Sequence, residues 1–125
     1  MTYVKVNDTL YPASITGKVH DREWDDRESK AITMEADFSV MNSLFPDNAI
    51  WSIVSEETLL VVDEEGTPIL DANGSETYET HQTEFDNSEF SVRGDLIIHT
   101  DGTCTVKMGK ETDLEAAYEI MYGGI

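Results

Sequence analysis

The chain has 125 residues and carries 26 Asp and Glu against 8 Lys and Arg, which gives a formal net charge of −18 at pH 7. A chain of this length suits one domain and can bury a core without a metal or a disulfide. This negative charge argues against binding to nucleic acid or to anionic lipid, because the chain has few Lys and Arg residues to neutralise phosphates.

The chain begins with a series of predicted antiparallel strands. Residues 3–6 and 9–11 are β-prone and flank an Asn-Asp pair, which supplies a two-residue hairpin turn. Apolar and polar residues then alternate over 14–20 and again over 30–36, as they do in strands that bury one face.

A short helix is expected over residues 37–45. Asp37 or Ser39 can cap its start, and Pro46 ends it because the residue before proline avoids the α region. Its apolar residues form one stripe, made of Phe38, Met41, Leu44 and Phe45.

The middle of the chain is its acidic part. Residues 31–92 contain 14 acids and no Lys or Arg. Two apolar runs within this region, at 49–54 and 58–63, each predict a strand. Trp51 in the first run is expected in the core.

The stretch 63–89 holds nine acids, no bases and the hairpin signal Asn73-Gly74. We expect it to form an exposed acidic hairpin or loop excursion from a single domain that spans residues 1–125. No internal repeat is evident in the sequence.

The C-terminal third predicts a further hairpin. Strands at 96–100 and 103–108 are joined by an Asp-Gly turn, and a two-residue loop between them places His99 opposite Cys104. Cys104 alternates with other apolar residues, so we expect it to pack in the core rather than to form a catalytic pair with His99.

A helix follows this hairpin. Thr112 and Glu115 form a capping box, in which each side chain satisfies a free amide at the start of the helix. Leu114, Ala117, Tyr118 and Met121 make its apolar face, and Gly123 can adopt the left-handed stop. We expect this helix to cover an open edge or face of the sheet.

Metal and catalytic signatures are missing from the sequence. Calcium loops centred on Gly66, Gly74 or Gly102 each place an apolar residue at the first ligand position. One cysteine and three scattered histidines do not suit zinc, and no nucleophile motif is present. We therefore expect no enzymatic activity, no catalytic residues, no metal and no cofactor.

The segment 20–28 is too polar for a core and forms a charged tip between two predicted strands. It nevertheless holds Trp24 among two arginines and five acids. Two roles are open for this tryptophan. It folds back onto its own sheet with Arg22 or Arg27 stacked on it, or it anchors an interface with another protein. Arg22, Trp24 and Arg27 are the candidate interface residues.

Three stretches together resemble a known group of proteins: residues 21–30, residues 86–90, and residues 106–110 with the tail 118–124. They are similar to small uncharacterised proteins encoded in prophages and phage-like regions of Gram-positive gut bacteria. The resemblance implies a phage context, in the structural or tail-assembly gene block. It implies no catalytic residues.

Together these patterns predict an α+β domain of mainly antiparallel β structure, either sandwich-like or a partly closed barrel, with a short mid-chain helix and a C-terminal helix. The expected function is that of a non-enzymatic phage or prophage structural or interaction protein. Its partner would be another protein chain, either a second copy or a phage or host protein, with no nucleic acid and no membrane. An oligomer is one expected form.

The expected location is the bacterial host cytoplasm or the virion, because the first eleven residues lack the apolar core of a signal peptide. Two other functions stay open. The first is an acidic decoy that mimics nucleic acid and occupies a host DNA- or RNA-binding protein. The second is a small hydrolase, which would need a concave pocket with convergent polar groups.

Overall fold

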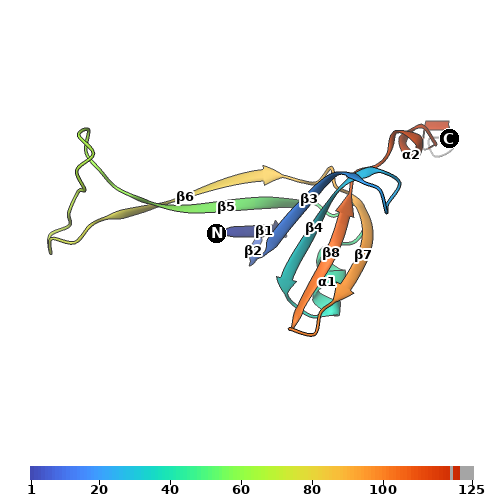
Figure 1. Cartoon of the computed structure of the whole chain (residues 1–125), viewed down its shortest axis with the longest axis horizontal. Helices are drawn as coiled ribbons and strands as arrows, with labels where there is room; N and C mark the ends of the chain where they lie inside the picture. Colours follow the sequence, from blue (N-terminus) through green and yellow to red (C-terminus); the bar gives the residue numbers. More distant parts are fainter. Residues whose placement is uncertain (119, 122–125) are drawn as a thin grey trace.

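Two four-stranded antiparallel sheets and two short helices make up the chain in the computed structural model, which describes residues 1–118 and 120–121 (Figure 1). The first sheet has the order β2-β1-β5-β6, built from β1 (Thr2–Val6), β2 (Thr9–Pro12), β5 (Trp51–Leu60) and β6 (Tyr78–Asp86). The second has the order β3-β4-β8-β7, built from β3 (Ser14–Asp21), β4 (Arg27–Glu35), β7 (Val92–Ile98) and β8 (Thr103–Gly109).

The helices are α1 (Phe38–Leu44) and α2 (Asp113–Tyr118). The predicted α+β class is therefore confirmed, with one helix in mid-chain and one near the C-terminus. In the described part of the chain neither sheet closes on itself, so the arrangement is two open sheets.

Local signals placed the first hairpin and α1 correctly. Asn7 and Asp8 both have positive φ, which the tight turn between β1 and β2 requires, and Val6 pairs with Thr9 across it. The carboxylate of Asp37 accepts a hydrogen bond of 2.9 Å from the backbone N–H of Val40, which confirms the predicted cap.

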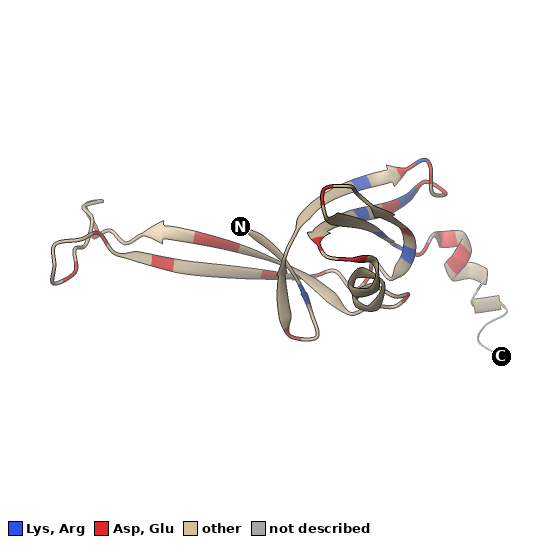
Figure 2. Cartoon of the chain, turned by 90° about the horizontal axis from the view of Figure 1, so that it is seen from below, with Lys and Arg blue, Asp and Glu red and all other residues tan. Residues whose placement is uncertain are grey.

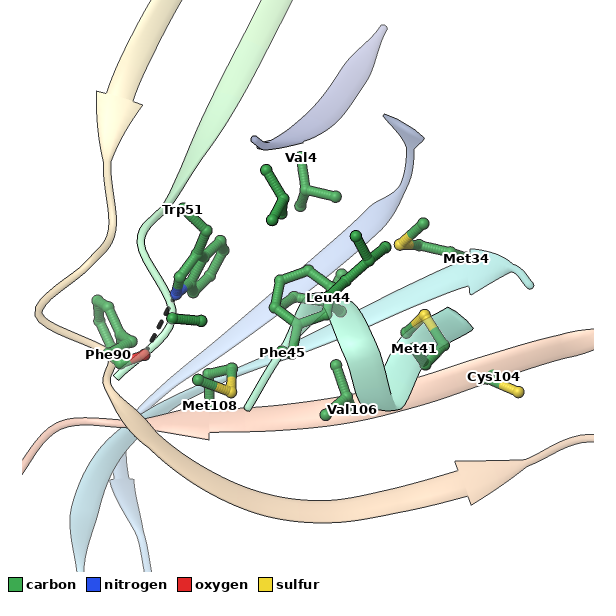
Figure 3. Close-up of a cluster of buried hydrophobic side chains, with 13 residues drawn as sticks. Val4, Met34, Met41, Leu44, Phe45, Trp51, Phe90, Cys104, Val106 and Met108 are labelled. Carbon is green, nitrogen blue, oxygen red and sulfur yellow. Dashed lines mark hydrogen bonds between the residues drawn. The ribbon is translucent and has the colours of Figure 1, made fainter. Parts of the chain in front are cut away.

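The core lies between the two sheets and α1 (Figure 3). Trp51 is fully buried, as predicted, and the edge of its ring meets Phe45 and Phe90 at centroid distances of 5.7 and 6.4 Å. Its indole N–H donates to the carbonyl of Phe90 at 3.2 Å, so the polar atom of the ring is satisfied inside the core. The other buried members come from both sheets, from α1 and from the connection between α1 and β5: Val4, Val6, Ile32, Met34, Met41, Leu44, Ala49, Cys104, Val106 and Met108.

β5 and β6 form a long arm that projects from the body (Figure 1). The first part of β5 also pairs with β1, up to Ser55, but beyond that residue β5 pairs with β6 alone. The separate strand expected over 58–63 is therefore wrong, because β5 continues without a break to Leu60. The excursion begins at Glu56 rather than at residue 63, and Asn87 at its far end is buried in the body.

The hairpin of β7 and β8 has a register one residue away from the expected one. His99 pairs with Thr103, so the loop has three residues, and Gly102 takes a φ of +90° in it. Cys104 consequently pairs with Ile98, while His99 bonds the hydroxyl of Thr105 at 2.8 Å. The expected pairing of His99 with Cys104 is wrong, because a shift of one residue turns a side chain to the other face of the sheet.

α2 begins with the predicted capping box but does not cover the sheet. The N–H of Thr112 donates to the carboxylate of Glu115 at 2.9 Å, and the N–H of Glu115 donates to the Thr112 hydroxyl at 3.2 Å. However, the helix has no buried residue, and Leu114 is 82% exposed. The expectation that it covers an edge or face is wrong, and Gly123 lies outside the described residues.

Candidate functional site

Trp24 lies flat on its own sheet. Its ring covers two glycines: a Cβ placed on Gly94 would fall 2.6 Å from the ring, and one placed on Gly109 would fall 2.8 Å from it. The guanidinium of Arg27 also lies over the ring, 4.6 Å from the ring centroid. Trp24 is half-buried by these contacts, so the intramolecular role weighed for it from the sequence is present.

Arg27 is almost fully buried and is used inside the chain. Its guanidinium donates to both carboxylate oxygens of Glu115, at 2.8 and 3.0 Å, and to the carbonyl of Lys110 at 3.1 Å. Arg22, in contrast, is exposed, and no ion pair of its side chain occurs among the described residues. The predicted interface of Arg22, Trp24 and Arg27 stays a prediction, and the surface that it leaves available is Arg22 with the outer part of Trp24.

A buried ion pair lies beside this turn. Asp21 is fully buried, and its carboxylate accepts hydrogen bonds of 2.9 Å from both Lys107 and the hydroxyl of Ser29. The bond from Lys107, and then that from Ser29, holds the pKa of Asp21 below its ordinary value. The pair therefore ties the end of β3 to β8, across β4.

Residues 21–30, 86–90 and 106–110, which carry most of the resemblance stated from the sequence, meet in space. Two cations lie over the ring of Phe90, with the ammonium of Lys30 4.5 Å and that of Lys110 5.2 Å from the ring centroid. Lys30 also donates to the side chain of Asn87, and Lys110 pairs with Glu28 at 2.9 Å. We use the name clasp for a set of nine residues: Asp21, Trp24, Arg27, Glu28, Lys30, Asn87, Phe90, Lys107 and Lys110. Its contacts join the two sheets, so the clasp serves folding.

The tip of the arm is a three-way junction. The backbone N–H of Val61 donates to the carbonyl of Thr77, that of Ile69 to Val61, and that of Thr77 to Ile69, at 2.9, 2.9 and 3.2 Å. These three bonds form a closed triangle from which two small hairpins leave, and both are visible at the far end of the arm in Figure 1.

Each small hairpin is held by one aspartate. The Asp63 carboxylate accepts from two backbone N–H groups at 2.9 and 3.0 Å, and the Asp71 carboxylate does the same at 2.8 and 3.0 Å. Gly66 and Gly74 take φ values of +83° and +78° at equivalent places. The sequence signal was present but missed, since VVDEEGT at 61–67 recurs eight residues later as ILDANGS at 69–75.

The arm tip exposes large apolar side chains to solvent. Tyr78 is 60% exposed and Leu70 is 55% exposed, and the others of this group are Leu59, Leu60, Val62 and Ile69. We call these six residues the tip patch. A two-stranded ribbon is marginally stable in water by itself, and grouped exposed apolar residues are typical of a surface that binds another molecule. The tip patch is thus the candidate functional site.

The described residues show little that suits catalysis or metal binding. They contain no group of three or more His, Cys, Asp and Glu side chains placed to hold a metal ion. The open hollows include one of about 450 Å³ beside α2, where Glu115 in the lining is already bound by Arg27, and a larger one of about 770 Å³ between the starts of β1 and β3 and the end of β4. Cys104 is buried away from His99. No helix in this part of the chain is long and apolar enough to cross a membrane.

The carboxylates of the arm are interleaved with other side chains. A nucleic-acid decoy needs carboxylates in a row about 7 Å apart along a strand, which is about every second residue. On β5, Glu56 shares its face with Thr58 and Leu60, and Glu84 on β6 is paired with Lys5 at 2.9 Å. These two strands give the decoy hypothesis no support, and it stays a prediction.

Comparisons of the chain with protein-family models, with curated proteins and with solved structures found no match to any of them.

Proposed function

We propose that the chain is a non-enzymatic structural protein of a phage or prophage, acting in the particle or its assembly by binding other protein chains. The observation that carries this proposal is the arm, which ends in an ordered junction with apolar side chains turned to solvent. The phage context comes from the resemblance of the clasp sequences, and the binding role comes from the arm.

An ordered tip supports binding rather than mere solubility. Fixing a loop costs backbone entropy, roughly 1–2 kcal/mol for each residue. The tip meets this cost with the hydrogen-bond triangle and the two aspartate-held turns, although none of its residues enters the core. A preformed tip avoids the ordering cost at the moment of binding, which strengthens association.

The test is to follow the tagged chain in a bacterial strain that carries its gene, after induction of particle production. We expect the chain to sediment with large assemblies in a density gradient. A variant with residues 62–76 replaced by an Asn-Gly turn should stay at the top of the gradient. The matched control is Ile50→Asp, which alters an exposed aliphatic residue on the body, outside the arm. Sedimentation of the shortened variant with the assemblies would refute the role given to the junction and its two small hairpins.

A further inference from the structure

We propose that the arm tip of one copy binds the end of β3 in a second copy, so that the chains join head to tail. This inference rests on the proposed function, because it uses the same tip patch, and it names the partner. The occupant of the tip is a second copy of this chain.

The tip presents apolar surface surrounded by negative charge. The arm between residues 56 and 86 carries ten acids and no Lys or Arg. Figure 2 shows only acidic colour along the arm, while basic residues gather in the body. A partner surface that fits the tip must therefore be basic and must offer apolar contact.

The end of β3 has these properties. Lys18 and Arg22 are exposed there, and neither side chain makes a hydrogen bond or ion pair within the described residues. Val19 between them is 69% exposed. The pairing of β3 with β4 is irregular between Lys18 and Asp21, and β3 is an edge strand of its sheet, so its outer edge faces solvent. We call Lys18, Val19 and Arg22 the acceptor.

The acids close to the acceptor are mostly engaged inside the chain. Asp21 is buried with Lys107, Asp25 pairs with Arg27 at 3.4 Å, and Asp26 lies 3.3 Å from His20. Seven of the eight bases lie on or beside the β3-β4-β8-β7 sheet, the exception being Lys5 on β1. The positive charge of the chain is therefore gathered in the body, and the acceptor holds the two bases whose side chains make neither a hydrogen bond nor an ion pair within the described residues, although Lys18 also acts electrostatically on Asp21.

The tip patch lies at one end of the long axis, and the end of β3 lies in the body, well away from it (Figure 1). A contact between them leaves one free tip and one free acceptor on every pair of chains. A contact made once per pair of chains is heterologous and continues as an open chain or closes as a ring, whereas two reciprocal contacts between antiparallel chains would close as a symmetric dimer. The head-to-tail arrangement is the first of these, and species larger than a dimer distinguish it from the second.

The experiment uses two variants, each with one disabled end. Ile69→Asp with Leu70→Asp places charge in the tip patch, and Lys18→Glu with Arg22→Glu reverses the acceptor. We expect the unchanged protein to form species larger than a dimer in sedimentation velocity as its concentration rises. Each variant alone should be monomeric, with association weakened about tenfold or more. Ile50→Asp is the control and should assemble as the unchanged protein does.

Mixing the two variants is the decisive step. Each retains one intact end, so an equal mixture should give a one-to-one dimer and nothing larger. That dimer should weaken between about 0.05 and about 0.5 M salt, because exposed charges are screened. Failure of the mixture to dimerise, or monomeric behaviour of the unchanged protein at every concentration, would overturn the head-to-tail contact. If the tagged chain still sedimented with assemblies in the host, the proposed function would stand without it.

Discussion

Replacing Gly94 by alanine tests whether the ring of Trp24 packs directly against Gly94. The backbone of Gly94 has an ordinary φ, so an alanine fits its conformation, but the added Cβ would lie 2.6 to 3.0 Å from three atoms of the Trp24 ring. Carbon atoms do not approach so closely, so the ring must move away from Gly94. Overpacking of this kind costs about 1–3 kcal/mol.

The expected loss can be expressed as a melting temperature. An unfolding entropy of roughly 2.1 cal/mol/K per residue gives about 0.26 kcal/mol/K for a chain of this length. A loss of about 2 kcal/mol in the free energy of unfolding therefore lowers the melting temperature by about 8 °C. Gly17→Ala is the matched control, since its Cβ would meet its nearest atom at 3.9 Å. An alanine in that strand should be neutral or should stabilise the fold by up to about 1 kcal/mol.

The same substitution in a Trp24→Ala protein shows whether the loss of stability comes from the contact between Gly94 and the Trp24 ring. Without the ring, the new methyl group has room, and alanine should then be better than glycine in a strand by about 0.5–1 kcal/mol. Gly94→Ala should thus destabilise the unchanged protein and stabilise the Trp24→Ala protein, in thermal melts followed by circular dichroism. Equal effects in the two backgrounds would show that Trp24 does not rest on Gly94.

Three further outcomes are expected. Since the pKa of Asp21 is lowered in the folded chain, its stabilising effect is present above the unfolded pKa of about 3.8 and is lost as pH falls through the lower folded value. Asp21→Asn should therefore melt earlier than the unchanged protein at neutral pH, and the difference should shrink in acid; a constant difference would contradict this assignment. Replacing residues 62–76 by Asn-Gly should leave the melting temperature within a few degrees, because none of these residues is buried; loss of cooperative melting would show that the tip supports the core. Melting in chelator and in millimolar calcium should agree within a few degrees, whereas a large rise with calcium would reveal a metal site.

Local signals in the sequence were sufficient where one short motif determines the backbone. The turn after Val6, the cap at Asp37 and the box of Thr112 and Glu115 each depend on residues that are close in the chain. Trp51 was also placed in the core correctly, because its neighbours form an apolar run.

The register of β7 with β8 and the position of α2 could not be predicted from short motifs. The choice between a two- and a three-residue loop near Gly102 depends on which faces of β7 and β8 find the core, and that is decided by strands far away in the sequence. For α2, an apolar face predicts burial, but none of its residues is buried, and its contact with the β3-β4-β8-β7 sheet is made by the polar pair of Glu115 and Arg27.

The candidate site was only half visible in the sequence. The acidic excursion was expected, yet its apolar residues were not combined into a patch, because they belong to two strands and two small hairpins. The eight-residue recurrence of an aspartate followed three residues later by glycine was the available signal. The segment 20–28 drew attention through Trp24, whereas the exposed bases near it, Lys18 and Arg22, come from the adjoining strand and turn.

The triangle of backbone bonds at the arm tip makes the tip modular. Each small hairpin is closed at the triangle and held by its own aspartate, so the residues at its turn take no part in the junction. Peptides inserted after Glu64 or after Ala72 would therefore be displayed at the end of the arm without altering the path of β5 and β6. The same independence lets mutations change the outer loops, one at a time, while the arm and the body that carry them keep their structure.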